Sequence, residues 1–277
     1  MVAPQTYVLK EALKEKSVDL RPRTELAAVP FFPQIDYYCG PSSLAMVLQA
    51  AGVDVKPEAL VDQVFLPGRK GSLQVEMLAA ARRDGLIAYE IEPRVTDLLR
   101  ELAAGTPAIV LENYGPFSWF PVWHYSVVVG YDLPELQVIR RSGTRARITT
   151  PLTIFEKIWK EEKYWAMVAI PPDRVPATAT ASEAHYTAAV VALEQTGQTR
   201  SAITAYDTLL KRWPGSLAAG WDGETPRTRC TIWPPPKILS ARLPSIIRAQ
   251  QRRSTTWHRC LPSAASSMKR CRRPNAR

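Results

Sequence analysis

Residues 31–52 read FFPQIDYYCGPSSLAMVLQAAG, and this stretch carries the strongest structural signal in the chain. Its second half repeats apolar side chains at helical spacing, which predicts a buried helix over residues 42–51. The turn before it, GPSS, has a proline where a helix tolerates one, because the first N–H groups of a helix have no partner in any case. Cys39 directly precedes this turn, so the sequence places a cysteine at the N-terminus of a buried helix.

The surroundings of Cys39 suit a nucleophile. Free amides of the first helical turn, and the positive end of the helix dipole, are expected to lower the pKa of the thiol. Gly40 lets the backbone approach a substrate closely. Gln34 lies near enough along the chain for its amide to donate to an oxyanion beside the sulfur. A small buried hydrophobic residue is the structural alternative for Cys39, and the Gln, Gly and Pro around it favour the nucleophile.

Cysteine and histidine usage points to one pair. Cys39 is the only cysteine among the first 220 residues, which excludes a disulfide there and is typical of a single nucleophile with a distant histidine. Of the three histidines, only His124 begins a predicted core strand, and we predict that it is the general base. The remaining histidines and cysteines are His185, His258, Cys230, Cys260 and Cys271.

The net charge of +10 is confined to the C-terminal segment. Residues 221–277 hold 13 Lys and Arg against 2 Asp and Glu, which leaves 23 basic and 24 acidic residues in residues 1–220. The main part of the chain is therefore close to neutral, and we expect no specific nucleic-acid partner. The apolar runs are far shorter than the ~18 residues of a membrane span. The N-terminus has no hydrophobic signal region, which predicts a cytoplasmic protein as written.

Apolar patterning after residue 52 predicts helices first and then strands. Val- and Ile-rich segments bounded by Gly, Pro and Asp are typical of strands, and this order with short turns indicates an α+β fold. The predicted helices cover residues 57–65, 73–83 (with Ser72 as N-cap and Gly85 as the stop), 95–104 and 152–160, and the predicted strands cover residues 107–113, 124–132, 136–142 and 164–170.

The sequence divides into an N-terminal extension (residues 1–27), a main domain (28–172), a Pro/Ala/Thr-rich linker (173–182), a helical hairpin (183–219) and a basic tail (221–277). The hairpin resembles one tetratricopeptide repeat, with a glycine between its helices. A single repeat cannot bury its own face, so we expect it to pack on a neighbouring repeat or on the main domain. The tail has no periodicity, which predicts disorder or an out-of-frame translation.

The combination of Gln34, Cys39-Gly40-Pro41, an apolar helix and the later strand HYSVVVGYD, which starts at His124, resembles the papain-like cysteine peptidases of the bacteriocin-processing (double-glycine) family. The similarity is greatest to the stand-alone branch, in which this domain precedes tetratricopeptide repeats. The resemblance implies that Cys39 is the nucleophile, His124 the general base and acid, and Gln34 the oxyanion donor. It also implies a peptide or protein substrate, and relatives that are often exported or lipid-anchored.

The third member of the catalytic site departs from that family. The family places an aspartate on the strand after the histidine, whereas this chain has the sequence VIRRSG there, with no carboxylate. Ser142, Asp132 and Asn113 are the three candidates for orienting the imidazole. A weaker orienting group would lower the rate without abolishing the chemistry, because a cysteine depends less on its base than a serine does.

Aromatic and basic side chains near the predicted site have two interpretations. They could wall a cleft, although core packing is the more common role of Trp and Phe. Residues 69–74 form either a cleft rim or a basic turn with an N-cap. One cysteine and one histidine in the main domain cannot build a zinc site, and no cofactor is expected. The aromatic residues are Tyr37, Tyr38, Trp119, Phe120 and Trp123.

The sequence therefore predicts a cysteine peptidase with a helical module that recruits a protein partner. Two alternatives stay open. The absence of the aspartate favours a non-catalytic peptide-binding scaffold, and the same fold could carry out an acyl transfer or amidase reaction instead of proteolysis.

Overall fold

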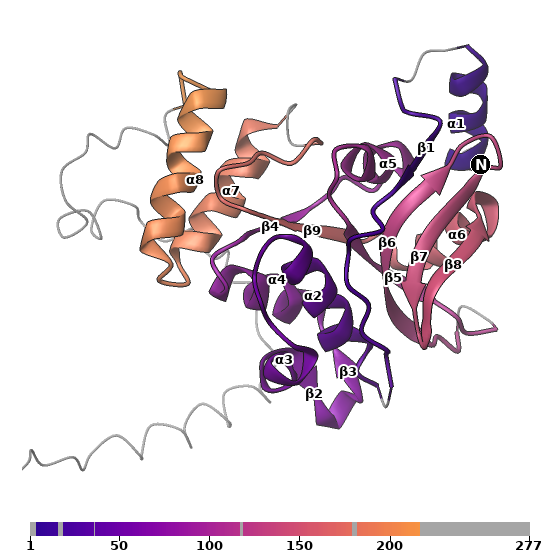
Figure 1. The fold of residues 1–277 in the computed structure, drawn as a ribbon, viewed down its shortest axis with the longest axis horizontal. Helices are drawn as coiled ribbons and strands as arrows, with labels where there is room; N and C mark the ends of the chain where they lie inside the picture. Colours follow the sequence, from indigo (N-terminus) through magenta and orange to yellow (C-terminus); the bar gives the residue numbers. More distant parts are fainter. Residues whose placement is uncertain (1–3, 16–18, 36, 117–118, 179–181, 217–277) are drawn as a thin grey trace, which may run out of the picture. The chain divides into compact units, whose positions relative to one another are not determined.

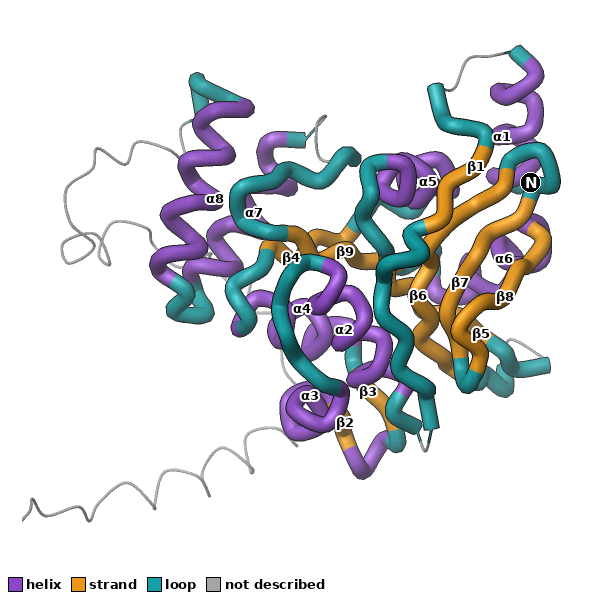
Figure 2. The backbone as a smooth tube through the Cα atoms, in the orientation of Figure 1, coloured by secondary structure: helices purple, strands orange, loops and turns teal. Residues whose placement is uncertain are grey.

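The computed structural model describes residues 4–15, 19–35, 37–116, 119–178 and 182–216, and the predicted basic tail lies outside them. These residues form a central antiparallel sheet with helices packed against both faces (Figures 1 and 2). The predicted α+β class is confirmed.

The main sheet has seven strands, and every pairing is antiparallel. Six strands follow the order β4-β9-β5-β6-β7-β8, and β1 pairs with β6. A separate two-stranded hairpin joins β2 and β3. The bounds are β1 Arg23–Glu25, β2 Phe65–Leu66, β3 Gly71–Ser72, β4 Ile87–Glu90, β5 Ala108–Asn113, β6 Trp123–Asp132, β7 Gln137–Ser142, β8 Arg145–Pro151 and β9 Ala166–Ile170.

The helices bury two hydrophobic cores, one on each face of the sheet. Side chains alternate between the faces along each strand, so Tyr125 and Val127 of β6 join the core beneath α2, whereas Val128 joins the core beneath α5 and α6. Helix α2 is buried along almost its whole length. The helices are α1 Gln5–Lys14, α2 Cys39–Ala50, α3 Pro57–Val64, α4 Gln74–Arg83, α5 Val95–Ala103, α6 Leu152–Trp159, α7 Glu183–Glu194 and α8 Thr199–Arg212, with short 3-10 turns at Pro67–Arg69 and Lys160–Glu162.

Strand β1 lies on β6 just past the end of β5. The β5 pairing ends where Ala108 faces Val128, and the β1 pairing follows along β6 from Gly130, which faces Glu25, the last residue of β1. A Cβ at Gly130 would lie 2.3 Å from the backbone oxygen of Thr24. Only glycine therefore allows β1 to approach this closely.

The N-terminal segment contributes more to the fold than the predicted extension implied. Helix α1 is fixed by a carboxylate from α6, because Glu156 accepts hydrogen bonds from the backbone N–H groups of Gln5 (2.6 Å) and Thr6 (2.8 Å). A carboxylate at a helix N-terminus satisfies donors that the helix itself leaves unpaired.

Two local predictions were wrong or incomplete. Ser72 is not the N-cap of α4; it lies in β3, and the N-cap position belongs to Leu73, which makes no side-chain cap bond. The short β4 and the largely exposed β8 were not predicted. Four residues are too few to show a period, and β8 has only one buried position to anchor its pattern.

The predicted helical hairpin consists of α7 and α8, which turn at Gly197, where φ is +80°. Its inner face packs on the main domain, because Tyr186, Val190 and Leu193 share a core with Ile87 of β4. This is one of the two packings expected for a single hairpin. The part of the predicted linker that the structure describes is also bound to the domain, since Thr178 donates to Glu101 of α5.

Candidate active site

Cys39 is the first residue of α2, and it is partly buried. The first N–H groups of a helix have no partner within it, and the backbone amides of Gly40 and Cys39 are directed at the sulfur. A Cβ at Gly40 would lie 2.2 Å from the hydroxyl of Ser72. Glycine at this position therefore lets the β3 segment pack directly against the helix N-terminus.

His124 lies near the start of β6, and its Nε2 is 2.9 Å from the Oγ of Ser142 at the end of β7. The ring also stacks on Tyr114, with the two centroids 5.2 Å apart. With Nε2 engaged by Ser142, Nδ1 is the ring nitrogen left for proton exchange with a neighbouring group. Among the described side chains, no hydrogen bond joins this imidazole to the thiol of Cys39.

The ionisation of the two groups differs from the predicted activated thiolate. Burial raises the pKa of the Cys39 thiol, and the backbone amides of Tyr125 and Gly40 only partly oppose this shift. Burial, together with the nearby Arg140 guanidinium, lowers the pKa of His124 to about 4. The expectation that the helix N-terminus would lower the pKa of the thiol is wrong, because desolvation exceeds the effect of the amides. At neutral pH the resting pair is a thiol and a neutral imidazole.

Gln34 lies beside Cys39, with its amide fully engaged. Its Nε2 donates to the Oγ of Ser43 (2.7 Å) and the carbonyl oxygen of Tyr125 (3.1 Å), with a longer contact of 3.5 Å to the carbonyl oxygen of Cys39. Its Oε1 accepts from the backbone N–H of Gly143 at 2.6 Å. Gln34 therefore connects the N-terminus of α2 to the turn that follows Ser142.

The other two candidates for orienting the imidazole are engaged elsewhere. Asp132 lies at the opposite end of β6 and pairs with Arg23 at 2.9 Å. Eight residues of strand separate it from His124, which is about 26 Å. The Oδ1 of Asn113 accepts from the backbone N–H groups of Gly115 and Val122, so this side chain closes a turn.

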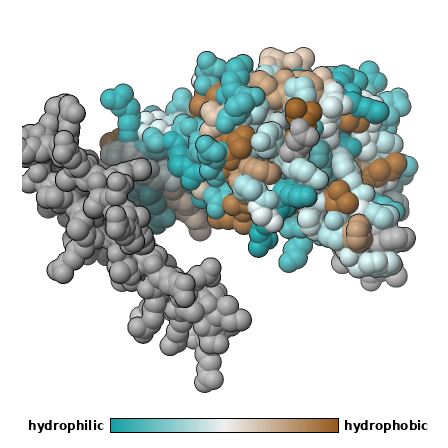
Figure 3. All heavy atoms as spheres, turned by 90° about the horizontal axis from the view of Figure 1, so that it is seen from below, coloured by the Kyte–Doolittle hydropathy of each residue, from teal (hydrophilic) through white to brown (hydrophobic). Residues whose placement is uncertain are grey.

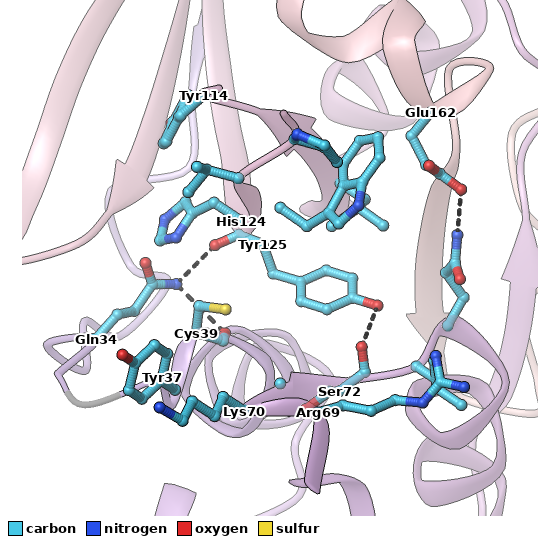
Figure 4. Close-up of a pocket in the computed structure, with 17 residues that line it drawn as sticks. Gln34, Tyr37, Cys39, Arg69, Lys70, Ser72, Tyr114, His124, Tyr125 and Glu162 are labelled. Carbon is cyan, nitrogen blue, oxygen red and sulfur yellow. Dashed lines mark hydrogen bonds between the residues drawn. The ribbon is translucent and has the colours of Figure 1, made fainter. Parts of the chain in front are cut away.

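Cys39, His124 and Gln34 line one cavity of about 720 Å³, and Figure 4 shows the three gathered at one side of it. The segment from Arg69 to Gln74 forms a rim, as one of its two interpretations predicted. Tyr37 and Trp123 also line the cavity, whereas Tyr38 packs edge-on against Phe65.

Several predicted core aromatics are in fact exposed. Trp119 is 79% exposed, Phe120 67% and Trp123 44%. Figure 3 shows that hydrophobic residues emerge at several separate places on the face seen from below. The expectation of core packing fails for these three because the segment leads from β5 to β6 around the mouth of the cavity and not across a face of the sheet.

Comparison with known proteins identifies the family of this domain. A profile of the Peptidase_C39 like family matches residues 26–167, which is just over half of the chain. The chain belongs to the Peptidase_C39-like family. The match ends before the α7–α8 hairpin, so the resemblance of that hairpin to a tetratricopeptide repeat stays a prediction.

Individual relatives of this C39-like chain are distant. An uncharacterized protein of Methanothermobacter thermautotrophicus is 29% identical over 123 residues, which cover 44% of this chain and 77% of that protein. A C39-like peptidase candidate from Bacillus anthracis superposes with a TM-score of 0.45 at 20% identity and covers 54% of this chain and 98% of its own. The peptidase domain of Streptococcus ComA, a bifunctional ABC transporter, gives a TM-score of 0.44 at 23% identity, with 52% and 98% covered.

Sequence reasoning missed a buried charged network behind the imidazole of this C39-like domain. Glu112 of β5 is fully buried and pairs with Arg140 of β7 at 2.6 Å. Tyr114 contacts both of them and also Ser142. The signal was present, because a glutamate within PAIVLEN and an arginine within LQVIRRS are charges in otherwise apolar strands, and buried charges need partners.

No three His, Cys, Asp or Glu side chains gather into a metal-binding group within the described part of the chain. None of the described helices is both long and apolar enough to cross a membrane.

Proposed function

We propose that this C39-like protein is a cysteine peptidase that hydrolyses peptide bonds, with Cys39 as nucleophile and His124 as general base and acid. The observation that carries the proposal is the imidazole of His124, which shares a cavity with the thiol and is oriented from behind by Ser142 at 2.9 Å. A nucleophile and a base that share a cavity, with an orienting group buried behind the base, are the parts that thiol catalysis requires.

The reaction begins from a neutral pair. The sulfur of Cys39 attacks the peptide carbonyl carbon while its proton passes to Nδ1 of His124. The resulting imidazolium donates this proton to the leaving amine, the C–N bond breaks, and a thioester remains on Cys39. Water then attacks the thioester with the imidazole as base, which releases the carboxylic acid and restores the thiol. Because the resting thiol is neutral, proton transfer has to accompany the attack.

The oxyanion of this reaction needs donors beside the sulfur. The backbone N–H of Cys39, at the free end of α2, is one candidate. The Nε2 of Gln34 is the second. One of its N–H groups is directed at Ser43, and the other is shared between the carbonyl oxygens of Tyr125 and Cys39, so the substrate oxygen would take this shared N–H. The contacts of Gln34 with Ser43 and Gly143 hold the amide in place during this exchange.

The cavity also supports a peptide substrate. A volume of about 720 Å³ lies in the range of ligand-binding sites, and the rim offers Tyr37 and Trp123 for apolar side chains together with Arg69 and Lys70 for acidic ones. We therefore propose a segment of extended peptide with mixed apolar and acidic character as the substrate class.

A comparison of cleavage products tests the proposal. A proteome-derived peptide library is incubated with the wild type and with Cys39→Ala, and new peptide termini are sequenced by mass spectrometry. The expected result is a set of cleavages that the wild type makes and the variant does not. Identical product sets would contradict the proposal. Addition of an amine acceptor distinguishes hydrolysis from acyl transfer, because transfer would yield amide products in place of free acids.

One observation favours a second function, that of a non-catalytic peptide-binding scaffold. The pKa of the thiol is raised, that of the imidazole is lowered to about 4, and the described side chains show no hydrogen bond between them. For a scaffold, the wild type and Cys39→Ala would retain library peptides equally and cleave none. The inner face of the α7–α8 hairpin is buried in the domain core. We therefore propose that the outer face of this hairpin binds a protein partner.

A further inference from the structure

The buried carboxylate of Glu112 is connected to the imidazole of His124 through the hydroxyl groups of Tyr114 and Ser142. We propose that Glu112, acting through Tyr114 and Ser142, is a positioning residue that holds His124 in the tautomer with the proton on Nε2. The inference rests on the proposed function for its catalytic consequence, but not for its structural content. It gives the site a carboxylate in spite of the serine at position 142.

The contacts form a continuous path. The Oγ of Ser142 lies 2.9 Å from Nε2 of His124 and 3.4 Å from the hydroxyl of Tyr114. The Tyr114 hydroxyl lies 2.8 Å from Oε2 of Glu112. Nη1 of Arg140 lies 2.7 and 2.6 Å from the two oxygens of Glu112 and 2.6 Å from the Tyr114 oxygen, so its two N–H groups are shared among three acceptors. The path therefore runs from strand β5, through the end of β7, to the imidazole on β6.

Counting protons gives this path one direction. A guanidinium only donates, so the Tyr114 oxygen accepts from Arg140, and its single proton goes to the Glu112 carboxylate. The contact between Tyr114 and Ser142 then needs its proton from Ser142. That leaves Ser142 with no proton for the imidazole, so it accepts from Nε2–H of His124. Nδ1 then carries the lone pair that a base requires.

The charges around the path support this polarity. Glu112 has no exposed surface, and burial raises the pKa of its carboxyl, while Arg140 and the hydroxyls of Tyr114 and Ser126 oppose that shift. The short ion pair with the Arg140 guanidinium, whose Nη1 contacts both carboxyl oxygens, favours the ionised carboxylate, which can only accept. Burial also raises the pKa of Tyr114 to about 12, so its hydroxyl keeps the proton that it donates.

The path also explains how Arg140 can lie near the imidazole. An unpaired guanidinium would repel the imidazolium that forms during catalysis. Pairing with Glu112 reduces this repulsion without removing it, since Arg140 still contributes to the lowered pKa of His124. The ionisable groups that face the imidazole are Glu112 from β5, Tyr114 from the residue directly after β5, Arg140 from β7 and Cys39 from α2.

The chain offers a matched pair of variants. Tyr114→Phe keeps the ring that stacks on His124 and removes only the hydroxyl in the path. Ser126→Ala removes another hydroxyl that bonds the same Glu112 oxygen, at 2.9 Å, but lies off the path. Long-range proton–nitrogen NMR spectra of the imidazoles report the tautomer directly, because the two ring nitrogens have widely separated shifts when one tautomer dominates and similar shifts when both are populated. His124→Gln assigns the signal.

In the wild type and in Ser126→Ala at pH 7, we expect separated ring-nitrogen shifts with the proton on Nε2. In Tyr114→Phe, and in Glu112→Gln if it folds, the separation should shrink. Where peptidase activity is measurable, Tyr114→Phe should lower kcat roughly 10–100-fold with KM little changed, as removal of partners that orient a histidine does at metal sites. Ser142→Asp supplies a carboxylate directly, so Tyr114→Phe in that background should change kcat by less than about twofold.

Unchanged ring-nitrogen shifts in Tyr114→Phe, or a wild-type imidazole with its proton on Nδ1, would overturn the inference. An equal loss of separation in Ser126→Ala would also overturn it, because the effect would then be a general disturbance of the network. The NMR measurement needs no substrate. A protein with the expected tautomer and no peptidase activity would therefore contradict the proposed function and leave this inference standing.

Discussion

The Nε2 of His124 lies 2.9 Å from the Oγ of Ser142, at the position where a carboxylate is expected in this family. A hydroxyl can orient an imidazole but cannot neutralise the imidazolium that forms during catalysis. The hydrogen bond is therefore sufficient to aim the base and insufficient to raise its pKa, which agrees with a His124 pKa of about 4.

Substitution of Ser142 tests this relationship. Ser142→Ala removes the acceptor for Nε2–H and should lower kcat roughly 10–100-fold, at least as much as Tyr114→Phe, because Ser142 contacts the imidazole directly. Ser142→Asp should raise the pKa of His124 through an adjacent negative charge. Steady-state kinetics with a peptide identified in the cleavage screen measure both effects. An active Ser142→Ala variant with unchanged kcat would show that Ser142 does not orient the base.

The reactivity of Cys39 toward a small alkylating reagent should depend on pH as that of an isolated buried thiol does. Burial raises its pKa above the ordinary value of 9.0, so the rate of reaction with iodoacetamide should rise through alkaline pH. Peptide mapping separates Cys39 from the cysteines near the C-terminus. A plateau of fast alkylation between about pH 4 and 8 would instead indicate a preformed thiolate–imidazolium pair, and would contradict the neutral resting state.

His124 should make the protein less stable in mild acid. Its pKa is about 4 in the folded protein against 6.5 ordinarily, so between these values the unfolded chain binds the extra proton. Its contribution to stability is complete above pH 6.5 and is lost as the pH falls toward 4, by up to about 3 kcal/mol. Urea unfolding of the wild type and of His124→Gln between pH 4.5 and 7.5 isolates this term. If the free energies of unfolding of the two proteins changed with pH in the same way, the lowered pKa of His124 would be contradicted.

The close approach of β1 to β6 should make Gly130 intolerant of a side chain. A methyl group there would lie 2.3 Å from the carbonyl oxygen of Thr24, so Gly130→Ala should lower the free energy of unfolding by about 1–3 kcal/mol. Gly68→Ala is the matched control, because an added Cβ there meets no atom within 4 Å and φ is not positive. Thermal and urea unfolding compare the two. An equal effect in both variants would mean that β1 does not need this approach.

The sequence was sufficient for the parts of the fold that repeat or stand out. Helix α2 was predicted because apolar residues recur from Leu44 onward at helical spacing, and β6 because a Val-rich run there is bounded by turn-forming residues. Helix α1 could not be predicted, since its N-terminus is stabilised by Glu156, a partner about 150 residues away. Contacts of this kind have no local signature.

For the site, too, features with a local sequence signal could be predicted and features that depend on distant contacts could not. Cys39, Gln34 and His124 could be named from their local settings, and the structure brings all three to one cavity. The three candidates for the orienting group could not be separated, because that choice depends on which strand end lies beside the imidazole. The raised pKa of the Cys39 thiol could not be foreseen either. It depends on burial by neighbouring elements, whereas the sequence displays only the helix N-terminus that opposes it.

The most direct test of the central claim, that His124 activates Cys39 toward a peptide carbonyl, is labelling by a peptidyl electrophile followed by mapping of the adduct. A peptidyl chloromethyl ketone built on a cleaved sequence is added to the wild type, His124→Ala and Cys39→Ala, and labelling at each cysteine is followed by mass spectrometry. We expect one rapid adduct on Cys39, formed at least about 100-fold more slowly without the imidazole. Labelling of Cys39 no faster than that of free cysteine, and unchanged in His124→Ala, would contradict it.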